Sequence, residues 1–223
     1  MFKTKQLLKK FNLSTAFFIL IANFFNKLFG KYFFLHIRMK RILDQNIPFE
    51  ELNNGNIRLH HCDYIIYCRK FSSDINVFNQ IFLDHEFTQL LEVVEKHQVH
   101  IQVIIDAGAN IGISSLWFIK HFPYSKIIAI EPDEANYNLL KLNLSENVQD
   151  SIVINKGIWK DSRKLYFDRT FRDGQSWSVS LSEKPISDNY IYSISLNDLI
   201  KELNIQGIDL LKIDIEGGEV SIF

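Results

Sequence analysis

Val103-Ile104-Ile105-Asp106-Ala107-Gly108-Ala109-Asn110-Ile111-Gly112 is the stretch from which the architecture of this chain can be worked out. A run of β-branched residues ends in a carboxylate, and a small-residue turn then leads into an apolar pattern over Ile113–Phe122. This order predicts a strand, a tight turn and a helix, in which the glycines allow positive φ and close backbone approach. We expect Asp106 to point its carboxylate into the crevice where open α/β sheets bind ligands.

A second acidic residue follows a second strand pattern. Lys126–Ile130 has the composition of a buried strand, and Glu131 stands at its carboxyl end. A carboxylate at the end of the second strand is placed to accept both hydroxyls of a ribose. The alternative is that Glu131 only caps the helix that follows Pro132-Asp133.

The composition of the loop favours a ligand without phosphates. A dinucleotide-binding loop needs G-x-G-x-x-G, whereas this loop has Ala109-Asn110 and no third glycine in register. S-adenosylmethionine offers an adenosine to Glu131 and an ammonium group to Asp106 or to loop carbonyls. We therefore predict S-adenosyl-L-methionine as the cofactor; an NAD-linked oxidoreductase or a sugar-nucleotide epimerase is the less favoured enzyme class.

Four spaced motifs resemble the FkbM family of S-adenosylmethionine-dependent methyltransferases. They are Asp106-Ala-Gly-Ala-Asn-Ile-Gly112, Glu131-Pro132, the Asn143 to Asn147 segment and Leu211-Lys-Ile-Asp-Ile-Glu-Gly-Gly-Glu219. The resemblance runs from about Asp74 to the C-terminus. It implies an α/β fold with a Rossmann-like class I methyltransferase sheet. The expected reaction is O-methylation of a hydroxyl on a glycan or small-molecule acceptor.

The candidate site residues come from these motifs. The apolar strand Leu210–Ile215 is expected beside the first strand, which brings Asp214 near the transferred methyl, where it would orient or deprotonate an acceptor hydroxyl. Glu216 is the second catalytic candidate; a divalent ion or a helix cap is the alternative for Glu216 and Glu219, although we assign no metal ligand. The predicted cofactor-binding residues are Asp106, Gly108, Ala109, Asn110, Gly112, Glu131, Pro132 and Ile158, the last because the adenine of similar methyltransferases lies in that loop.

Composition limits the class of partner. The chain has 223 residues, of which 47% are hydrophobic and 23% charged, and its net charge is −1. It therefore suits one globular domain with an appendage, and it offers no broad basic surface for nucleic acid. Cys62 and Cys68 lie in one strand-like segment and cannot close a disulfide there, which favours reduced thiols and a cytoplasmic location.

We predict three segments: an N-terminal helical segment 1–56, a strand and helix lead-in 57–100, and a methyltransferase core 101–223. In the first, an amphipathic helix over 11–29 either covers the catalytic domain or lies in a membrane interface, and it is short for a membrane span. In the second, Ile57–Arg69 indicates a hairpin and the pattern from Phe87 to Val94 a helix. The non-enzymatic alternative is a membrane-associated interaction module.

The rest of the core alternates strands and helices. We expect a helix over Glu134–Asn147 capped by Asp133, a strand over Ser151–Asn155 and two or three short strands within Asp161–Ile194 that wall the acceptor pocket. A further helix should begin after Ser195. Because Leu210–Ile215 has the pattern of a strand buried on both faces and the sequence stops at Phe223, we expect a sheet that lacks its last strands. A catalytically inactive methyltransferase fragment is the corresponding alternative function.

Overall fold

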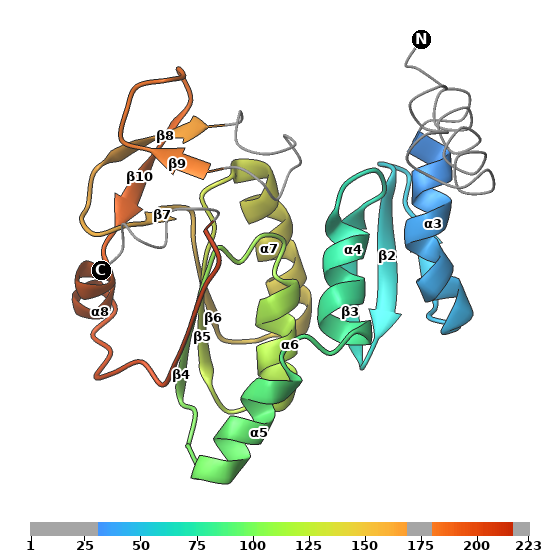
Figure 1. Cartoon of the computed structure of the whole chain (residues 1–223), viewed down its shortest axis with the longest axis horizontal. Helices are drawn as coiled ribbons and strands as arrows, with labels where there is room; N and C mark the ends of the chain where they lie inside the picture. Colours follow the sequence, from blue (N-terminus) through green and yellow to red (C-terminus); the bar gives the residue numbers. More distant parts are fainter. Residues whose placement is uncertain (1–30, 169–179, 216–223) are drawn as a thin grey trace, which may run out of the picture. The chain divides into compact units, whose positions relative to one another are not determined.

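A computed structural model describes residues 31–168 and 180–215 of the chain, which divides into two compact units, residues 1–46 and 47–223. The described part of the first unit contains helix α3 (Lys31–Asp44), drawn in blue in Figure 1. The amphipathic helix predicted over 11–29 lies outside the described residues. No helix among residues 31–168 and 180–215 combines the length and the apolar character that a membrane crossing needs.

The second unit is a mixed α/β structure around a parallel sheet, which confirms the predicted fold class at that level. The described strands are β4 (Val103–Ala107), β5 (Lys126–Ile130), β6 (Ser151–Ile154) and β11 (Leu210–Ile213), in the order β11-β4-β5-β6. All three neighbouring pairs are parallel. In this register Asp106 lies opposite Lys212 on one side and Ala129 on the other. The carboxyl ends of these strands therefore meet at one edge of the sheet.

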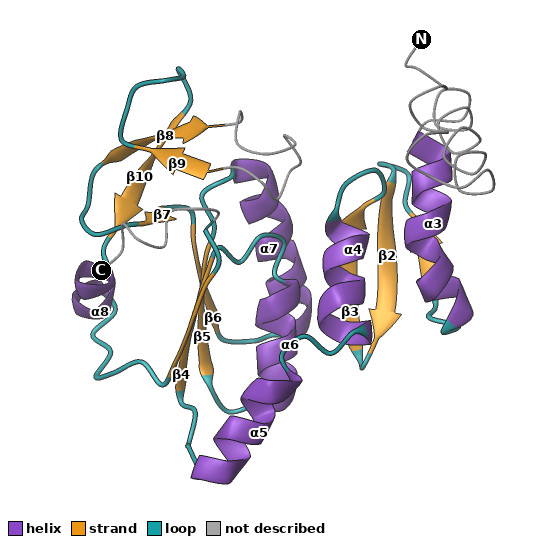
Figure 2. Ribbon diagram, viewed as in Figure 1, coloured by secondary structure: helices purple, strands orange, loops and turns teal. Residues whose placement is uncertain are grey.

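Helices cover both faces of this sheet (Figure 2). On one face lie α5 (Thr88–His97), α6 (Ile113–His121) and α7 (Glu134–Asn147); on the other lies α8 (Leu196–Glu202). The α8 face is apolar, with Leu199 packed into a buried cluster that includes Ile105, Ile128 and Ile130. Two predicted caps are confirmed, since Asp133 accepts from the second and third residues of α7 and Ser195 accepts from Asp198 N at 3.0 Å.

A second sheet adjoins the parallel one. Its strands are β7 (Gly157–Ile158), β8 (Lys164–Asp168), β9 (Ser180–Ser182) and β10 (Tyr190–Ile194), in the order β7-β10-β8-β9. β10 pairs with β7 in parallel and with β8 antiparallel. The short strands predicted within Asp161–Ile194 are therefore confirmed, while residues 169–179 of this segment lie outside the described residues.

The unit begins with a three-stranded antiparallel sheet formed by β1 (Phe49–Glu51), β2 (Asn56–His61) and β3 (Tyr64–Arg69). The predicted hairpin is confirmed, but placing both cysteines on one strand was wrong. Cys62 is exposed in the turn with a φ of 52°, and Cys68 is buried in β3. Both thiols are free. A turn of two residues with positive φ, Cys62 and Asp63, was not apparent in a segment without glycine.

Two asparagines of α7 occupy the outer edge of β3. The Asn143 amide accepts from Tyr67 N at 2.7 Å and donates to Tyr67 O at 3.1 Å. The Asn147 amide accepts from Ile65 N at 2.8 Å and donates to Ile65 O at 2.6 Å. The spacing works because four helical residues rise about 6 Å and two strand residues about 6.6 Å. Each side-chain amide thus takes the place of a neighbouring strand.

Helix α4 (Asp74–Phe78) continues directly into a π-helical turn, η1 (Asn79–Leu83). This pair was not predicted. Its apolar residues Ile75, Phe78, Ile81 and Phe82 are buried and recur at helical spacing, which was the available signal. The element nevertheless matters, because its polar residues face the cavity described next.

Candidate functional site

A cavity of about 670 Å³ opens at the carboxyl ends of β4, β5 and β11. The strand ends form one wall, and residues of α4 and η1, among them Asn76 and Gln80, form another. Seven of the predicted site residues line it: Gly108, Ala109, Asn110, Glu131, Pro132, Ile158 and Asp214. The structure therefore brings most of the predicted residues together in one place. Whether they bind a cofactor stays a prediction.

The loop after β4 has the backbone that its glycines predict. Gly108, Asn110 and Gly112 have φ values of 74°, 52° and 90°. A Cβ atom on Gly108 would lie 1.9 Å from the Asp214 carbonyl oxygen, and one on Gly112 would lie 2.8 Å from the Leu140 side chain. The close approach that requires these glycines is thus between the loop and its own protein neighbours. Gly112 is not part of the cavity lining.

Glu131 lies in the cavity wall with its side chain almost wholly buried. Its Oε2 accepts from Asn110 N at 2.9 Å, and its Oε1 accepts from Asp133 N at 3.0 Å and Asn136 Nδ2 at 3.2 Å. Burial raises the pKa of this carboxyl to about 7, although the three hydrogen bonds oppose the rise. The cap and the ligand-binding interpretations of Glu131 both have a structural basis, because its carboxylate accepts hydrogen bonds from the turn before α7 and also faces the cavity.

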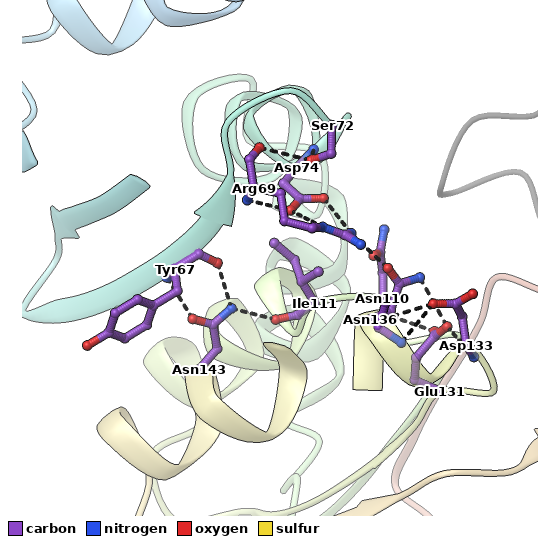
Figure 3. A network of polar contacts seen from close by, with 11 residues as sticks. Tyr67, Arg69, Ser72, Asp74, Asn110, Ile111, Glu131, Asp133, Asn136 and Asn143 are labelled. Carbon is purple, nitrogen blue, oxygen red and sulfur yellow. Dashed lines mark hydrogen bonds and ion pairs between the residues drawn. The ribbon is translucent and has the colours of Figure 1, made fainter. Parts of the chain in front are cut away.

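The position of Glu131 is tied to the N-terminal sheet through a chain of polar contacts (Figure 3). Asn136 donates to Glu131 and accepts from Arg69 Nη2 at 2.7 Å. The Arg69 guanidinium also binds both carboxylate oxygens of Asp74 at 2.9 Å. Asp74 is fully buried at the start of α4, whereas the Arg69 side chain keeps 25% of its surface exposed. This chain of contacts joins β3, α4 and α7, so no local pattern in one segment could predict it.

Asp106 does not point into the cavity, and the expectation that it does was wrong. Its side chain is fully buried, and Oδ2 accepts from the hydroxyls of Ser114 at 2.6 Å and Ser115 at 2.7 Å. Its Oδ1 lies 3.0 Å from Lys212 Nζ. The reason is strand alternation: Ile105 and Ala107 face α8, so Asp106 faces α6.

Lys212 is a cavity residue that the sequence analysis passed over. Its Nζ donates to Gly108 O at 2.8 Å, pairs with Asp106 and lies 3.8 Å from Asp214 Oδ2. Burial lowers the pKa of Lys212, but the charges of Asp106 and Asp214 outweigh this and raise it above its usual value. A lysine inside an otherwise apolar strand was the available signal, because such a charge needs a partner.

The two predicted catalytic acids have different outcomes. Asp214 lies just beyond β11, its backbone N donates to Ala107 O at 3.0 Å, and its carboxylate is 67% exposed in the cavity lining. Glu216 lies outside the described residues, as does Glu219. Within residues 31–168 and 180–215 there is no group of three or more His, Cys, Asp or Glu side chains arranged to hold a metal ion.

The unit has a glycine-containing loop after its first parallel strand, an acid after the second and a cavity over both. This is the edge at which open α/β sheets bind ligands. The comparison with known families is more specific. Residues 106–223 match the model of the methyltransferase FkbM domain, and the chain belongs to this family.

Individual relatives agree with this assignment. The chain is 27% identical over 152 residues to methyltransferase sdnD of Sordaria araneosa, covering 53% of this chain and 58% of the relative. It is 26% identical over 141 residues to methyltransferase 1 of Beauveria bassiana, covering 53% and 56%. The chain thus spans somewhat more than half the length of these relatives. A crystal structure of an FkbM methyltransferase from Methylobacillus flagellatus KT matches 55% of this chain and 28% of its own, with 20% identity and a TM-score of 0.39.

Proposed function

We propose that this protein is an S-adenosylmethionine-dependent methyltransferase with a Rossmann-like class I sheet, and that the cavity over β4 and β5 binds the cofactor. The observation that carries the proposal is Glu131, a buried carboxylate in the cavity wall at the end of the second strand. A carboxylate in this position is suited to a ribose hydroxyl. When bound, S-adenosylmethionine supplies a methyl group activated by the positively charged sulfur.

The acceptor atoms at Glu131 fit a ribose. Three donors occupy three of the roughly four acceptor positions of this carboxylate, which leaves one on Oε2. Asn110, whose N–H binds Oε2, has a buried Oδ1 without a hydrogen-bond partner in the described part of the chain. These two neighbouring acceptors match the two hydroxyls of a ribose. In this arrangement Glu131 Oε2 accepts a hydrogen bond from one ribose hydroxyl and Asn110 Oδ1 accepts one from the other. This replaces the prediction that Glu131 accepts from both.

The remaining lining residues suit the other parts of the cofactor. Pro132 and the almost fully buried Ile158 provide apolar surface for the adenine ring. Glu131, Asp133 and Asp214 give the cavity a negative field that favours a cationic sulfonium. An NAD-linked enzyme is disfavoured because the loop lacks the third glycine that lets backbone amides surround a diphosphate.

We propose a hydroxyl of a small molecule or glycan as the methyl acceptor, with nucleic acid excluded as a substrate. Asp214 is the candidate that orients or deprotonates this hydroxyl, and Glu216 is the second candidate. The Asp214 carboxylate is 67% exposed, and we expect it to contribute mainly by positioning the acceptor hydroxyl. The two free cysteines support a location in the reducing cytoplasm.

Calorimetric titration with S-adenosylhomocysteine, the product form of the cofactor, tests the proposal. Wild-type protein should bind it, and Glu131→Gln should weaken binding by about 10- to 100-fold because a charged acceptor is replaced by a neutral amide. Glu95→Gln, on the exposed surface of α5, is the matched control and should bind like the wild type. Equal affinity in the wild type and in a folded Glu131→Gln protein would refute the proposed site.

A further inference from the structure

The charges that line the cavity are strongly unequal. Among the lining residues that the structure describes, Glu86, Glu131, Asp133 and Asp214 are acidic, and Lys212 is the single cation. Lys212 projects from β11 at the level of Asp106 on the neighbouring strand. A ligand with one negative group among positive ones would therefore find one attractive position for its anion.

The Lys212 ammonium has one donor available for such an anion. An ammonium carries three N–H donors. One is directed to Gly108 O at 2.8 Å and a second pairs with Asp106 Oδ1 at 3.0 Å. Asp214 Oδ2 lies 3.8 Å away, which is beyond hydrogen-bond distance. The side chain keeps 16% of its surface exposed and contributes to the cavity lining.

The same contacts exclude the ammonium group of the cofactor from this position. The sequence suggested that Asp106 or the loop carbonyls would accept that ammonium. Instead, Asp106 and the Gly108 carbonyl are both occupied by the Lys212 ammonium. A second ammonium placed there would meet a like charge in a poorly solvated site, which is unfavourable.

We infer that Lys212 binds the carboxylate of the methionine part of S-adenosylmethionine, an inference that rests on the proposed function. The carboxylate takes the free N–H of Lys212, while the cofactor's ammonium and sulfonium lie towards the acidic remainder of the cavity. Lys212 thereby has two tasks, since it holds the Gly108 turn against β11 and it recognises the amino-acid end of the ligand.

The test compares S-adenosylhomocysteine with its decarboxylated analogue, which lacks only the carboxylate. Wild-type protein should prefer S-adenosylhomocysteine by about 10- to 100-fold, as expected for a charge-assisted hydrogen bond. The informative variant is Lys212→Met combined with Asp106→Asn, because removing Lys212 alone leaves a buried carboxylate without its partner. In this double variant the preference should fall to about twofold or less. Asp106→Asn alone retains Lys212 and should retain the preference.

Each outcome is decisive when both affinities are measured by calorimetry and folding is checked by circular dichroism. A double variant that loses affinity for both ligands equally, or that keeps the full preference, overturns the role of Lys212. If Lys212→Met with Asp106→Asn does not fold, Lys212→Gln with Asp106→Asn replaces it, since glutamine can still donate to Gly108 O. If the wild-type protein binds S-adenosylhomocysteine and its decarboxylated analogue with nearly equal affinity, the inference is overturned and no variant is needed. Wild-type protein that binds neither ligand overturns the proposed function itself.

Discussion

Glu131 should make the unliganded protein less stable as the pH rises. Its pKa is about 7 in the folded chain, against 4.5 for an ordinary glutamate. Between these two values the folded state holds a proton that the unfolded state has released, so the free energy of unfolding decreases with increasing pH. The contribution of this group is fully present below pH 4.5 and is lost as the pH passes 7. The total is about 3 kcal/mol, of which about 2.5 kcal/mol falls between pH 5 and pH 8.

The perturbation that isolates this effect is Glu131→Gln. Glutamine has no proton to release, so the difference in unfolding free energy between wild type and variant cancels the other titrating groups. The variant loses part of the hydrogen bonding to Asn110 N and Asp133 N, because its amide NH₂ is a donor facing donors. That cost is the same at every pH. It changes the offset between the two proteins and leaves the pH dependence unaffected.

Urea unfolding followed by tryptophan fluorescence at pH 5, 6, 7 and 8 gives the two free energies. The free energy of unfolding of the wild type minus that of the variant should fall by about 2.5 kcal/mol from pH 5 to pH 8. The Glu95→Gln control should show no such trend, because this glutamate is exposed on α5. A difference that stays constant within about 0.5 kcal/mol across the range would show that Glu131 is not the buried, destabilised acid described above.

Three further predictions concern the same site. The affinity for S-adenosylhomocysteine should fall about tenfold between pH 8 and pH 6, because protonation of Glu131 below its pKa of about 7 removes an acceptor; calorimetry showing a flat profile would contradict this. Gly108→Ala should cost more than about 3 kcal/mol in urea unfolding, whereas Gly55→Ala, also at positive φ but with nothing within 4 Å, should cost about 1 kcal/mol; similar costs would argue against the tight turn. Asn143→Ala should cost about 2 to 4 kcal/mol by leaving buried backbone groups unpaired, while Asn138→Ala on the exposed side of α7 should change stability by less than about 0.5 kcal/mol; equal effects would contradict the bridging role.

The elements that the sequence predicted well are those with a local pattern. The parallel strands around Ile104, Ile128 and Val153 are continuous apolar runs, and α7 begins at a recognisable aspartate cap. The position of Glu131 followed from the rule that ligands bind at the carboxyl ends of parallel strands. The rule concerns the backbone, and it correctly placed most of the cavity-lining residues.

The parts that the sequence did not predict depend on contacts between distant elements. The direction of the Asp106 side chain depends on which face of β4 receives Ser114 and Ser115, and the strand pattern is apolar on both faces. Lys212 acquires its role only when β11 pairs with β4 in a register that places it opposite Asp106. The link from Arg69 through Asn136 to Glu131 joins residues far apart in the sequence. No periodicity within one segment contains this information.

The hydrogen bonds from the two α7 asparagines to β3 also affect the tendency of the protein to aggregate. An open strand edge is a template to which another polypeptide can add, and many β proteins protect such edges with charge or bulges. Here the side chains of Asn143 and Asn147 take up the N–H and C=O groups of Tyr67 and Ile65. α7 thus protects the edge of β3 from pairing with another chain. Replacing both asparagines with alanine would leave the backbone groups of this edge unpaired, and copies of the chain could then associate through it and aggregate.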